Sequence, residues 1–333
     1  MTRSALRLAA LFGAATLALA GCAGTETSAS TESSSELITI RVQSQQSLAT
    51  EAMYVGVDKG FFEDEGLKVE FVDVPDTSAA FAALQSNNLE FAFSPEIGTL
   101  QAVRQGLDLS MVAPVDGINP ATETAAPDEV RKYTASGVYV SKASGITDLE
   151  GLAGATIAVP ILKSQPDATI NSVLLEQGVE TDDINWLTLD FVSAVAALKD
   201  GQVDAAFLTT PYTAEADAAG LLRIMNPSVE FFKKGGVTAW TASGSWVEKN
   251  PDTVAAFQRA VKTTADYANA NLTEIKESVI KHAGMDLKPE DLSDSYWPTS
   301  VVPAEVQRID DQLVESGFFE TGIDVSEHIA PQQ

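Results

Sequence analysis

The chain has very few of the side chains from which enzymes build reactive centres. Its 333 residues include one cysteine, Cys22, and two histidines, His282 and His328, which both lie near the C-terminus. The motifs GxSxG, HExxH and GxxxxGKS/T are absent from the sequence, and so is any cluster of cysteines. Nucleophilic, acid–base and metal-assisted catalysis depend on such groups. The sequence therefore predicts a protein that is not an enzyme and that needs no metal or cofactor.

Basic residues and long apolar runs are scarce as well. The chain has 21 lysines and arginines against 47 aspartates and glutamates, and its formal net charge is −26. Such a charge repels the phosphates of nucleic acids and the head groups of anionic lipids. Beyond the N-terminal segment, no apolar run is long enough to span a membrane. Because a single cysteine allows no disulfide within the chain, we expect a well-solvated monomer that is stabilised by packing and binds no nucleic acid.

The first 21 residues have the form of an export signal. Arg3 and Arg7 precede the apolar stretch 8–20, which is shorter than the roughly 20 residues of a membrane-spanning helix. The signal leads into Leu-Ala-Gly-Cys at residues 19–22, which resembles the bacterial lipobox, where the cysteine is lipidated and becomes the new N-terminus. Ordinary secretion is the alternative, but it would leave an odd reactive thiol. We therefore expect a diacylglyceryl anchor on Cys22 that holds the exported protein at the outer face of the cell membrane.

Two regions of different texture follow the export signal. Residues 22–36 are rich in Ser, Thr and Glu and have almost no bulky apolar side chains, which predicts a flexible tether. Strand-like and helix-like stretches then alternate in two successive runs, which favours an α/β fold with two lobes, mostly parallel sheets and a cleft between the lobes. The expected division is a first part of lobe 1 (37–115), an irregular excursion near the crossover (116–136), lobe 2 (137–235), and a return to lobe 1 with C-terminal helices (236–333).

Periodicity and helix-terminating residues place the individual elements. The predicted strands are 38–42, 68–74, 90–93, 108–115, 138–140, 156–159, 186–189, 205–208 and 237–242. The predicted helices are 49–57, 77–85, 95–105, 167–177, 193–199 and 212–219, with another that starts at Asn250-Pro251 and mostly helical structure from there to about residue 320. Gly60 and Gly66 are expected to adopt positive φ.

Four segments in a fixed order resemble one family of transport proteins. Residues 52–69 contain Lys-Gly-Phe-Phe at 59–62 and Gly-Leu at 66–67, and the other three segments are 146–160, 201–205 and 246–257. Together they resemble the solute-binding proteins of ABC importers in the nitrate, sulfonate, taurine and thiamine-precursor group. The resemblance implies a two-lobed, periplasmic-binding-protein-like fold of type II. It also implies three partners, namely a small-molecule solute and the permease and ATPase of an ABC importer.

The carboxyl ends of the strands are the expected place for the solute, because ligands of open α/β sheets lie beyond those ends. Polar residues there precede helices, whose first N–H groups bind polar or anionic atoms. The candidate ligand-binding residues are Gln45, Gln46, Ser47, Ser94, Pro95, Glu96, Lys163, Ser164, Gln165, Thr209, Thr210, Pro211, Tyr212 and Trp240. Helix capping without any ligand is the alternative for Ser94, Ser164 and Thr210.

The sequence leaves the charge of the solute open. Ser and Gln side chains at helix N-termini, with Lys163 nearby, suit nitrate or a sulfonate. Glu96 and Asp167 stand at the same termini and would oppose an anion, unless they cap their own helices. They could instead accept hydrogen bonds from a heteroaromatic amine that stacks on Tyr212 or Trp240.

These features predict a lipid-anchored binding protein that closes its lobes around a solute and delivers it to a permease. A lipoprotein that senses or scaffolds with the same cleft is the alternative, because fold and cleft do not separate the two roles. A pyrimidine synthase is a further alternative, since such enzymes are related to this family. Those enzymes, however, carry Cys and His residues that this chain lacks.

Overall fold

The structure is a computed structural model that describes residues 37–126 and 128–333. The export signal, Cys22 and the predicted tether lie outside the described residues, so the lipid anchor stays a prediction. In the part that the structure describes, no helix has both the length and the apolar character needed to cross a bilayer.

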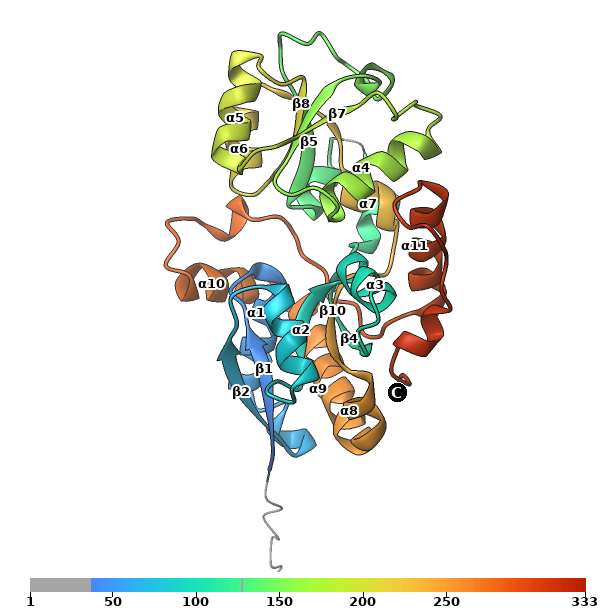
Figure 1. Ribbon diagram of the computed structural model, residues 1–333. Helices are drawn as coiled ribbons and strands as arrows, with labels where there is room; N and C mark the ends of the chain where they lie inside the picture. Colours follow the sequence, from blue (N-terminus) through green and yellow to red (C-terminus); the bar gives the residue numbers. More distant parts are fainter. Residues whose placement is uncertain (1–36, 127) are drawn as a thin grey trace, which may run out of the picture. The chain divides into compact units, whose positions relative to one another are not determined.

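Lobe 1 contains a two-stranded and a three-stranded sheet, and one of its five strands runs against the other four (Figure 1). Its strands are β1 (Ile38–Ser44), β2 (Leu67–Asp73), β3 (Ala92–Pro95), β4 (Leu109–Gly117) and β10 (Gly236–Ser243). Its helices are α1 (Leu48–Asp58), α2 (Thr77–Gln85), α3 (Glu96–Arg104), α8 (Gly244–Lys249), α9 (Pro251–Ala270) and α10 (Leu272–His282). A parallel bridge from Val42 to Phe91 joins β1 to the start of β3, and β10 lies antiparallel between β3 and β4. The order across the lobe is therefore β2-β1-β3-β10-β4.

Lobe 2 repeats this plan with a single sheet of five strands. Its strands are β5 (Ser136–Val140), β6 (Thr156–Val159), β7 (Asn185–Thr188), β8 (Ala205–Thr209) and β9 (Leu222–Met225). Its helices are α4 (Gln165–Glu176), α5 (Phe191–Asp200), α6 (Tyr212–Ala218) and α7 (Pro227–Phe232). The order is β7-β6-β8-β5-β9, and β5 alone runs antiparallel to its neighbours. In both lobes the carboxyl ends of the remaining strands share one edge, which is where a parallel sheet presents its binding loops.

The predicted elements are present, with their ends within two residues of the expected positions. Helix α2 has the predicted bounds because Asp76 accepts a hydrogen bond from the N–H of Ala79 at 2.8 Å and so starts the helix. Gly60 and Gly66 adopt φ of 83° and 77°, as expected for the turns between α1 and β2.

The sequence prediction is wrong after α10, where the chain is not helical again until α11 (Pro303–Glu315). Gly284 leaves α10 in a left-handed conformation with φ of 61°, and only a short 3₁₀ turn at Pro289–Asp291 interrupts the irregular run that follows. The prediction also missed β9, α7 and α8. These elements are four to six residues long, so their periodicity is too short to detect in the sequence.

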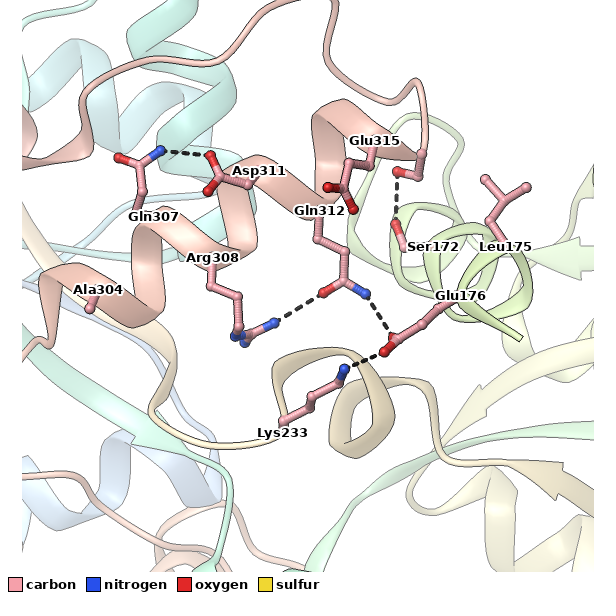
Figure 2. A pocket seen from close by; sticks show the side chains of 11 residues that line it. Ser172, Leu175, Glu176, Lys233, Ala304, Gln307, Arg308, Asp311, Gln312 and Glu315 are labelled. Atoms are coloured by element: carbon pink, nitrogen blue, oxygen red, sulfur yellow. Dashed lines mark hydrogen bonds and ion pairs between the residues drawn. The ribbon is translucent and has the colours of Figure 1, made fainter. Parts of the chain in front are cut away.

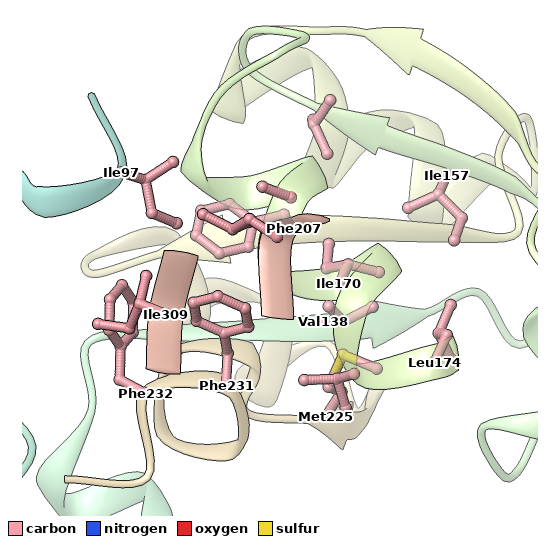
Figure 3. Packing of buried hydrophobic residues seen from close by; sticks show 14 of the residues in the cluster. Ile97, Val138, Ile157, Ile170, Leu174, Phe207, Met225, Phe231, Phe232 and Ile309 are labelled. Atoms are coloured by element: carbon pink, nitrogen blue, oxygen red, sulfur yellow. The ribbon is translucent and has the colours of Figure 1, made fainter. Parts of the chain in front are cut away.

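Helix α11 packs against both lobes (Figure 1). Its apolar residues Val306, Ile309 and Leu313 belong to a buried cluster that includes Ile97 from α3 and Leu174 from α4. Figure 3 shows Ile309 beside Phe231 and Phe232 of α7, with Ile97 nearby. Helix α11 therefore joins the two lobes by packing, in addition to the two segments of the chain that cross between them.

Candidate functional site

A hollow of about 580 Å³ lies between the lobes at the strand ends. Lobe 1 contributes the first turn of α2 and the segment from Pro95 through α3, and lobe 2 contributes the loop between β6 and α4. Four candidate residues line this hollow, namely Pro95, Lys163, Ser164 and Gln165. We refer to it as the first hollow.

The first hollow combines an apolar wall with a small set of polar groups. Phe81, Ile97 and Ile161 contribute apolar surface, while Gln101 and Lys163 contribute donors. The ammonium of Lys163 is on an exposed side chain, and no resolved ion pair engages it among the described residues. A small solute with a polar or anionic head and an apolar part matches such a lining.

Lys163 has an unusual backbone conformation that the adjacent helix maintains. Its φ is 57°, in the left-handed region that lysine seldom adopts. The carboxylate of Asp167 accepts hydrogen bonds from the N–H groups of Lys163 and Ser164, both at 2.8 Å. Asp167 therefore forms a capping box with Ser164 at its own helix, as the sequence allowed, and its negative charge lies at the N-terminus of α4.

Helix α3 is the helix at the first hollow whose N-terminus has no side-chain cap. Its N-cap residue is Pro95, and no side chain accepts a hydrogen bond from the first turn. By contrast, α2 is capped by Asp76, and Ser164 and Asp167 form a capping box at α4. The first-turn N–H groups of a helix have no partner within the helix, and Ile97 and Gly98 of that turn line the first hollow. The geometry therefore favours α3 as the place for negatively charged or polar atoms.

The carboxyl group of Glu96 does not line the first hollow. The residue is 2% exposed, and its Oε1 lies so close to Gly236 that a Cβ there would be 2.4 Å away. Burial, and secondarily the negative charge of Asp116, raise the pKa of Glu96 from 4.5 to about 7. A group with that pKa is about half protonated at pH 7 and mostly neutral below it, so Glu96 opposes an anion at α3 less than an ordinary glutamate would.

Several other candidate side chains are engaged within the protein. Ser94 is fully buried, and its hydroxyl bonds those of Thr99 and Thr241 at 2.7 and 2.8 Å. Trp240 is 3% exposed and packs in the apolar core of lobe 1, so its ring is not available for stacking on a solute. Neither residue lines the first hollow.

The loop from Gln45 to Ser47 lies between β1 and α1 and is held by two side chains of α1. The hydroxyl of Tyr54 accepts a hydrogen bond from the N–H of Gln45 at 3.2 Å, and Thr50 donates to its carbonyl at 2.6 Å. Ser47 caps α1 by accepting from the N–H of Thr50 at 3.3 Å, and Gln46 is exposed.

A second hollow, of about 460 Å³, lies between lobe 2 and the segment that follows α10. It is lined by Thr210, whose hydroxyl donates to the carbonyl of Ala135 at 3.3 Å. Two of its lysines already have acidic partners, since Lys276 pairs with Asp294 and Lys132 with Glu129. The neighbouring candidates Thr209 and Tyr212 are partly exposed, Pro211 is exposed, and Tyr212 stacks on Phe191 with ring centroids 5.4 Å apart.

A third hollow, of about 690 Å³, lies between α4, α7 and α11 (Figure 2). Its polar side chains bond one another, as when Gln312 bridges Arg308 and Glu176 while Lys233 pairs with Glu176. It lies away from the strand ends and contains none of the candidate residues. We therefore take the first hollow as the candidate functional site.

The sequence analysis missed several residues of the first hollow. Thr77 and Ser78 follow the end of β2, so the strand-end rule that found Pro95 and Lys163 also applied to them. Gly98 and Gln101 lie within α3, and nothing in the sequence shows which face of that helix meets lobe 2. Among the described residues, no group of three or more potential metal-ligating side chains is brought together.

The sequence from residue 49 to residue 275 matches the family described as NMT1/THI5 like. The chain belongs to the NMT1/THI5-like family. This NMT1/THI5-like protein is 26% identical over 263 residues to the Bacillus subtilis (strain 168) protein named "Putative aliphatic sulfonates-binding protein". That alignment covers 77% of this chain and 72% of the relative.

Solved structures share the fold of this NMT1/THI5-like protein at low sequence identity. The periplasmic aliphatic sulphonate binding protein SsuA from Escherichia coli is 19% identical with a TM-score of 0.66, over 89% of this chain and 98% of that one. The periplasmic nitrate-binding protein NrtA from Synechocystis PCC 6803 is 14% identical with a TM-score of 0.63, over 88% and 86% of the two chains. The predicted α/β fold of the periplasmic-binding-protein kind is thereby confirmed.

Proposed function

We propose that this protein is the solute-binding component of an ABC importer and that it captures a small oxyanion, with an organic sulfonate as the first choice. The observation that carries the proposal is the first hollow, which is lined both by the uncapped first turn of α3 in lobe 1 and by Lys163 of lobe 2. A B. subtilis relative and an E. coli structural neighbour named for aliphatic sulfonates support this choice. The apolar wall of Phe81, Ile97 and Ile161 favours an organic sulfonate over nitrate, because only the former has a carbon skeleton to bury.

Capture requires the lobes to favour the arrangement that surrounds the solute. A solute can shift this equilibrium only by its different affinity for the two arrangements. Groups from both lobes line the first hollow, so a solute that contacts α3 and the loop between β6 and α4 at once stabilises their approach. The closed protein then docks on a permease and releases its load.

A heteroaromatic amine is the alternative solute. It would use Gln101, Gln165 and the hydroxyls of the first hollow as acceptors, without the stacking on Trp240 that the sequence allowed. A sensing or scaffolding role is the alternative function with the same site. Genes for a permease and an ATPase beside the gene of this protein would favour import.

A panel of solutes tests the proposal and the role of Lys163 together. With residues 37–333, we expect alkanesulfonates or taurine to raise the melting temperature, while pyrimidines and flavins do not. Ligand at 100 times its dissociation constant adds about 2.7 kcal/mol of stability. Lys163→Gln should weaken sulfonate binding about 10- to 100-fold in calorimetry, since hydrogen bonds to charged groups contribute about 1.5–3 kcal/mol.

The matched control is Lys199→Gln on α5, where a half-exposed lysine pairs with Glu215 away from the first hollow. It should leave the dissociation constant unchanged. If both variants bind as tightly as the unaltered protein, the solute does not use Lys163. If no member of the panel binds, the proposed solute class is wrong.

We further propose that Cys22 carries a lipid that keeps the protein at the outer face of the cell membrane. The motif at residues 19–22 supports this anchor. In cells fed labelled fatty acid, the unaltered protein should carry the label and remain in the membrane fraction. Cys22→Ala should lose the label and leave that fraction, and retention of both by the variant would contradict the proposal.

A further inference from the structure

Two carboxyl groups lie close together where the chain crosses between the lobes. Glu96 is the first residue of α3, and its Oε2 is buried without a hydrogen-bond partner. Asp116 is next to last in β4, the strand that leaves lobe 1, and it accepts a hydrogen bond from the hydroxyl of Thr238 on β10. Neither carboxyl forms an ion pair with any of the described residues. A buried carboxylate without a partner is costly, so this arrangement calls for an explanation.

Glycines bring the two crossing segments together at this point. A Cβ on Gly236 would lie 2.4 Å from Oε1 of Glu96 and 3.9 Å from the carbonyl oxygen of Asp116. A Cβ on Gly117 would lie 2.2 Å from the carbonyl oxygen of Gly235. The carboxyl of Glu96 therefore packs directly on the backbone of the returning segment, and any rotation of the lobes about these strands changes its surroundings.

The charged groups around Glu96 come from three segments, namely β4, α11 and the stretch that leads into β10. Besides Asp116 on β4, Arg308 and Glu305 of α11 act on it, the arginine lowering its pKa and the glutamate raising it. The guanidinium of Arg308 is occupied elsewhere, since it donates to the carbonyls of Phe231 and Phe232 at 3.1 and 2.6 Å. Lys234, in the returning segment, pairs with Glu305 at 3.2 Å. Among the residues that the structure describes, neither Arg308 nor Lys234 forms an ion pair with Glu96 or Asp116.

We propose that Glu96 is a proton-binding site at the hinge, backed by Asp116, and that its protonation couples the orientation of the two lobes to pH. With a proton on Glu96, the close packing of α3, β4 and β10 buries one negative charge at most. Without it, the packed segments hold two negative charges that act on each other, and arrangements that hydrate them become more stable. Protonation of Glu96 and the orientation of the lobes are then thermodynamically linked, so that each shifts the equilibrium of the other.

The direction of the pKa shifts determines whether low or high pH favours the buried arrangement. Burial raises the pKa of Glu96 to about 7 and that of Asp116 to about 6 in the arrangement described here. Hydration would return both toward their ordinary values of 4.5 and 3.8. The buried arrangement thus binds more protons between these limits, so it is favoured as the pH falls and weakened as the pH rises toward 7.

Small-angle scattering of the protein without solute tests this inference independently of the proposed function. Between about pH 5 and about pH 9, the scattering curve of the unaltered protein should change, with a midpoint near the pKa of Glu96. Glu96→Gln, which resembles the protonated acid, should keep the low-pH curve throughout. Glu315→Gln, at an exposed position on α11, should follow the unaltered protein. Identical behaviour of Glu96→Gln and the unaltered protein would overturn the coupling.

Two further measurements distinguish the proposed coupling from simple misfolding of the variant, namely the melting temperature at two pH values and an NMR titration of the unaltered protein. Glu96→Gln should melt well above the unaltered protein at about pH 9 and by a much smaller margin at about pH 5, because the penalty for burying this glutamate grows as the pH rises from its ordinary pKa to its raised one. Equal destabilisation at both values would indicate a merely structural role. Carbon-13 NMR of the unaltered protein, assigned with the variant, should find a glutamate carboxyl that titrates near neutrality. Titration of Glu96 at its ordinary pKa would refute the proton site outright.

Discussion

Replacing Phe257 by alanine is expected to lower the free energy of unfolding by about 3–5 kcal/mol, the usual cost of emptying a fully buried aromatic site. Phe257 lies on α9, is 0% exposed, and stacks on Phe91 with ring centroids 3.7 Å apart and planes within 7°. It also lies edge-on to Trp240 at 6.4 Å. The ring thus fastens α9 to the sheet of lobe 1 at β3 and β10. Urea unfolding followed by circular dichroism measures the loss.

Phe61→Ala is the matched control for this prediction. Phe61 is a partly exposed phenylalanine of the same lobe, with its ring edge against Tyr267 at 5.6 Å. Because much of its surface is already in contact with water, its removal should cost clearly less. Equal losses of unfolding free energy for the two variants would contradict the prediction that burial and stacking make Phe257 the larger contributor to stability.

Replacing Arg104 by alanine is expected to cost about 3–5 kcal/mol, since it leaves a buried carboxylate without its cation. Arg104, on α3, forms an ion pair with Asp310 of α11, and Asp310 is 0% exposed. The guanidinium also lies 3.8 Å from the ring centre of Phe319 and donates to the carbonyl of Leu100 at 3.1 Å. Chemical unfolding measures the stability. Calorimetry with a sulfonate that binds the unaltered protein should show weaker binding to the variant. The second effect follows because this pair attaches α11 to the helix that faces the first hollow.

Arg259→Ala is the comparison for the exposed case. Arg259 pairs with Glu65 at 2.7 Å, but half of its side chain is in water. Exposed pairs contribute about 0–1 kcal/mol, so this variant should differ little from the unaltered protein. The double variant Arg104→Ala/Asp310→Ala should recover part of the stability lost in Arg104→Ala. If it recovers none, the stranded charge is not the cause of the loss.

Local signals in the sequence were enough to find most helices and strands. The bounds of α2 and β6 follow from short-range patterns, and Gly60 and Gly66 took the backbone conformations that only glycine adopts freely. The alternation of elements also predicted two α/β lobes. The irregular structure of residues 283–302 was not predicted, because its path depends on contacts with distant segments. One such contact is the hydrogen bond from the N–H of Gly117 to the carbonyl of Tyr296.

The candidate site was predictable to the extent that it depends on strand ends. Pro95 and Lys163 lie on different lobes, yet both line the first hollow, because each follows a strand at the edge where its sheet opens. Trp240 illustrates the limit of this reasoning. An alternating strand shows two faces, and the sequence does not show that the face bearing Trp240 meets α9 rather than the cleft.

What the sequence by itself determined is the class of protein, from few reactive groups, an alternation of strands and helices typical of two α/β lobes, and segments typical of a solute-binding family; the export signal and the lipid on the lone cysteine stay predictions. What only the tertiary structure decided is the state of individual charged groups. Asp167 is a helix cap because its carboxylate meets two N–H groups at 2.8 Å, and Glu96 is a buried acid because β10 passes over it. The physical reason is that solvation and pairing are set by neighbours far apart in the chain. A pKa near 7 therefore arises at Glu96 only where α3, β4 and β10 come together.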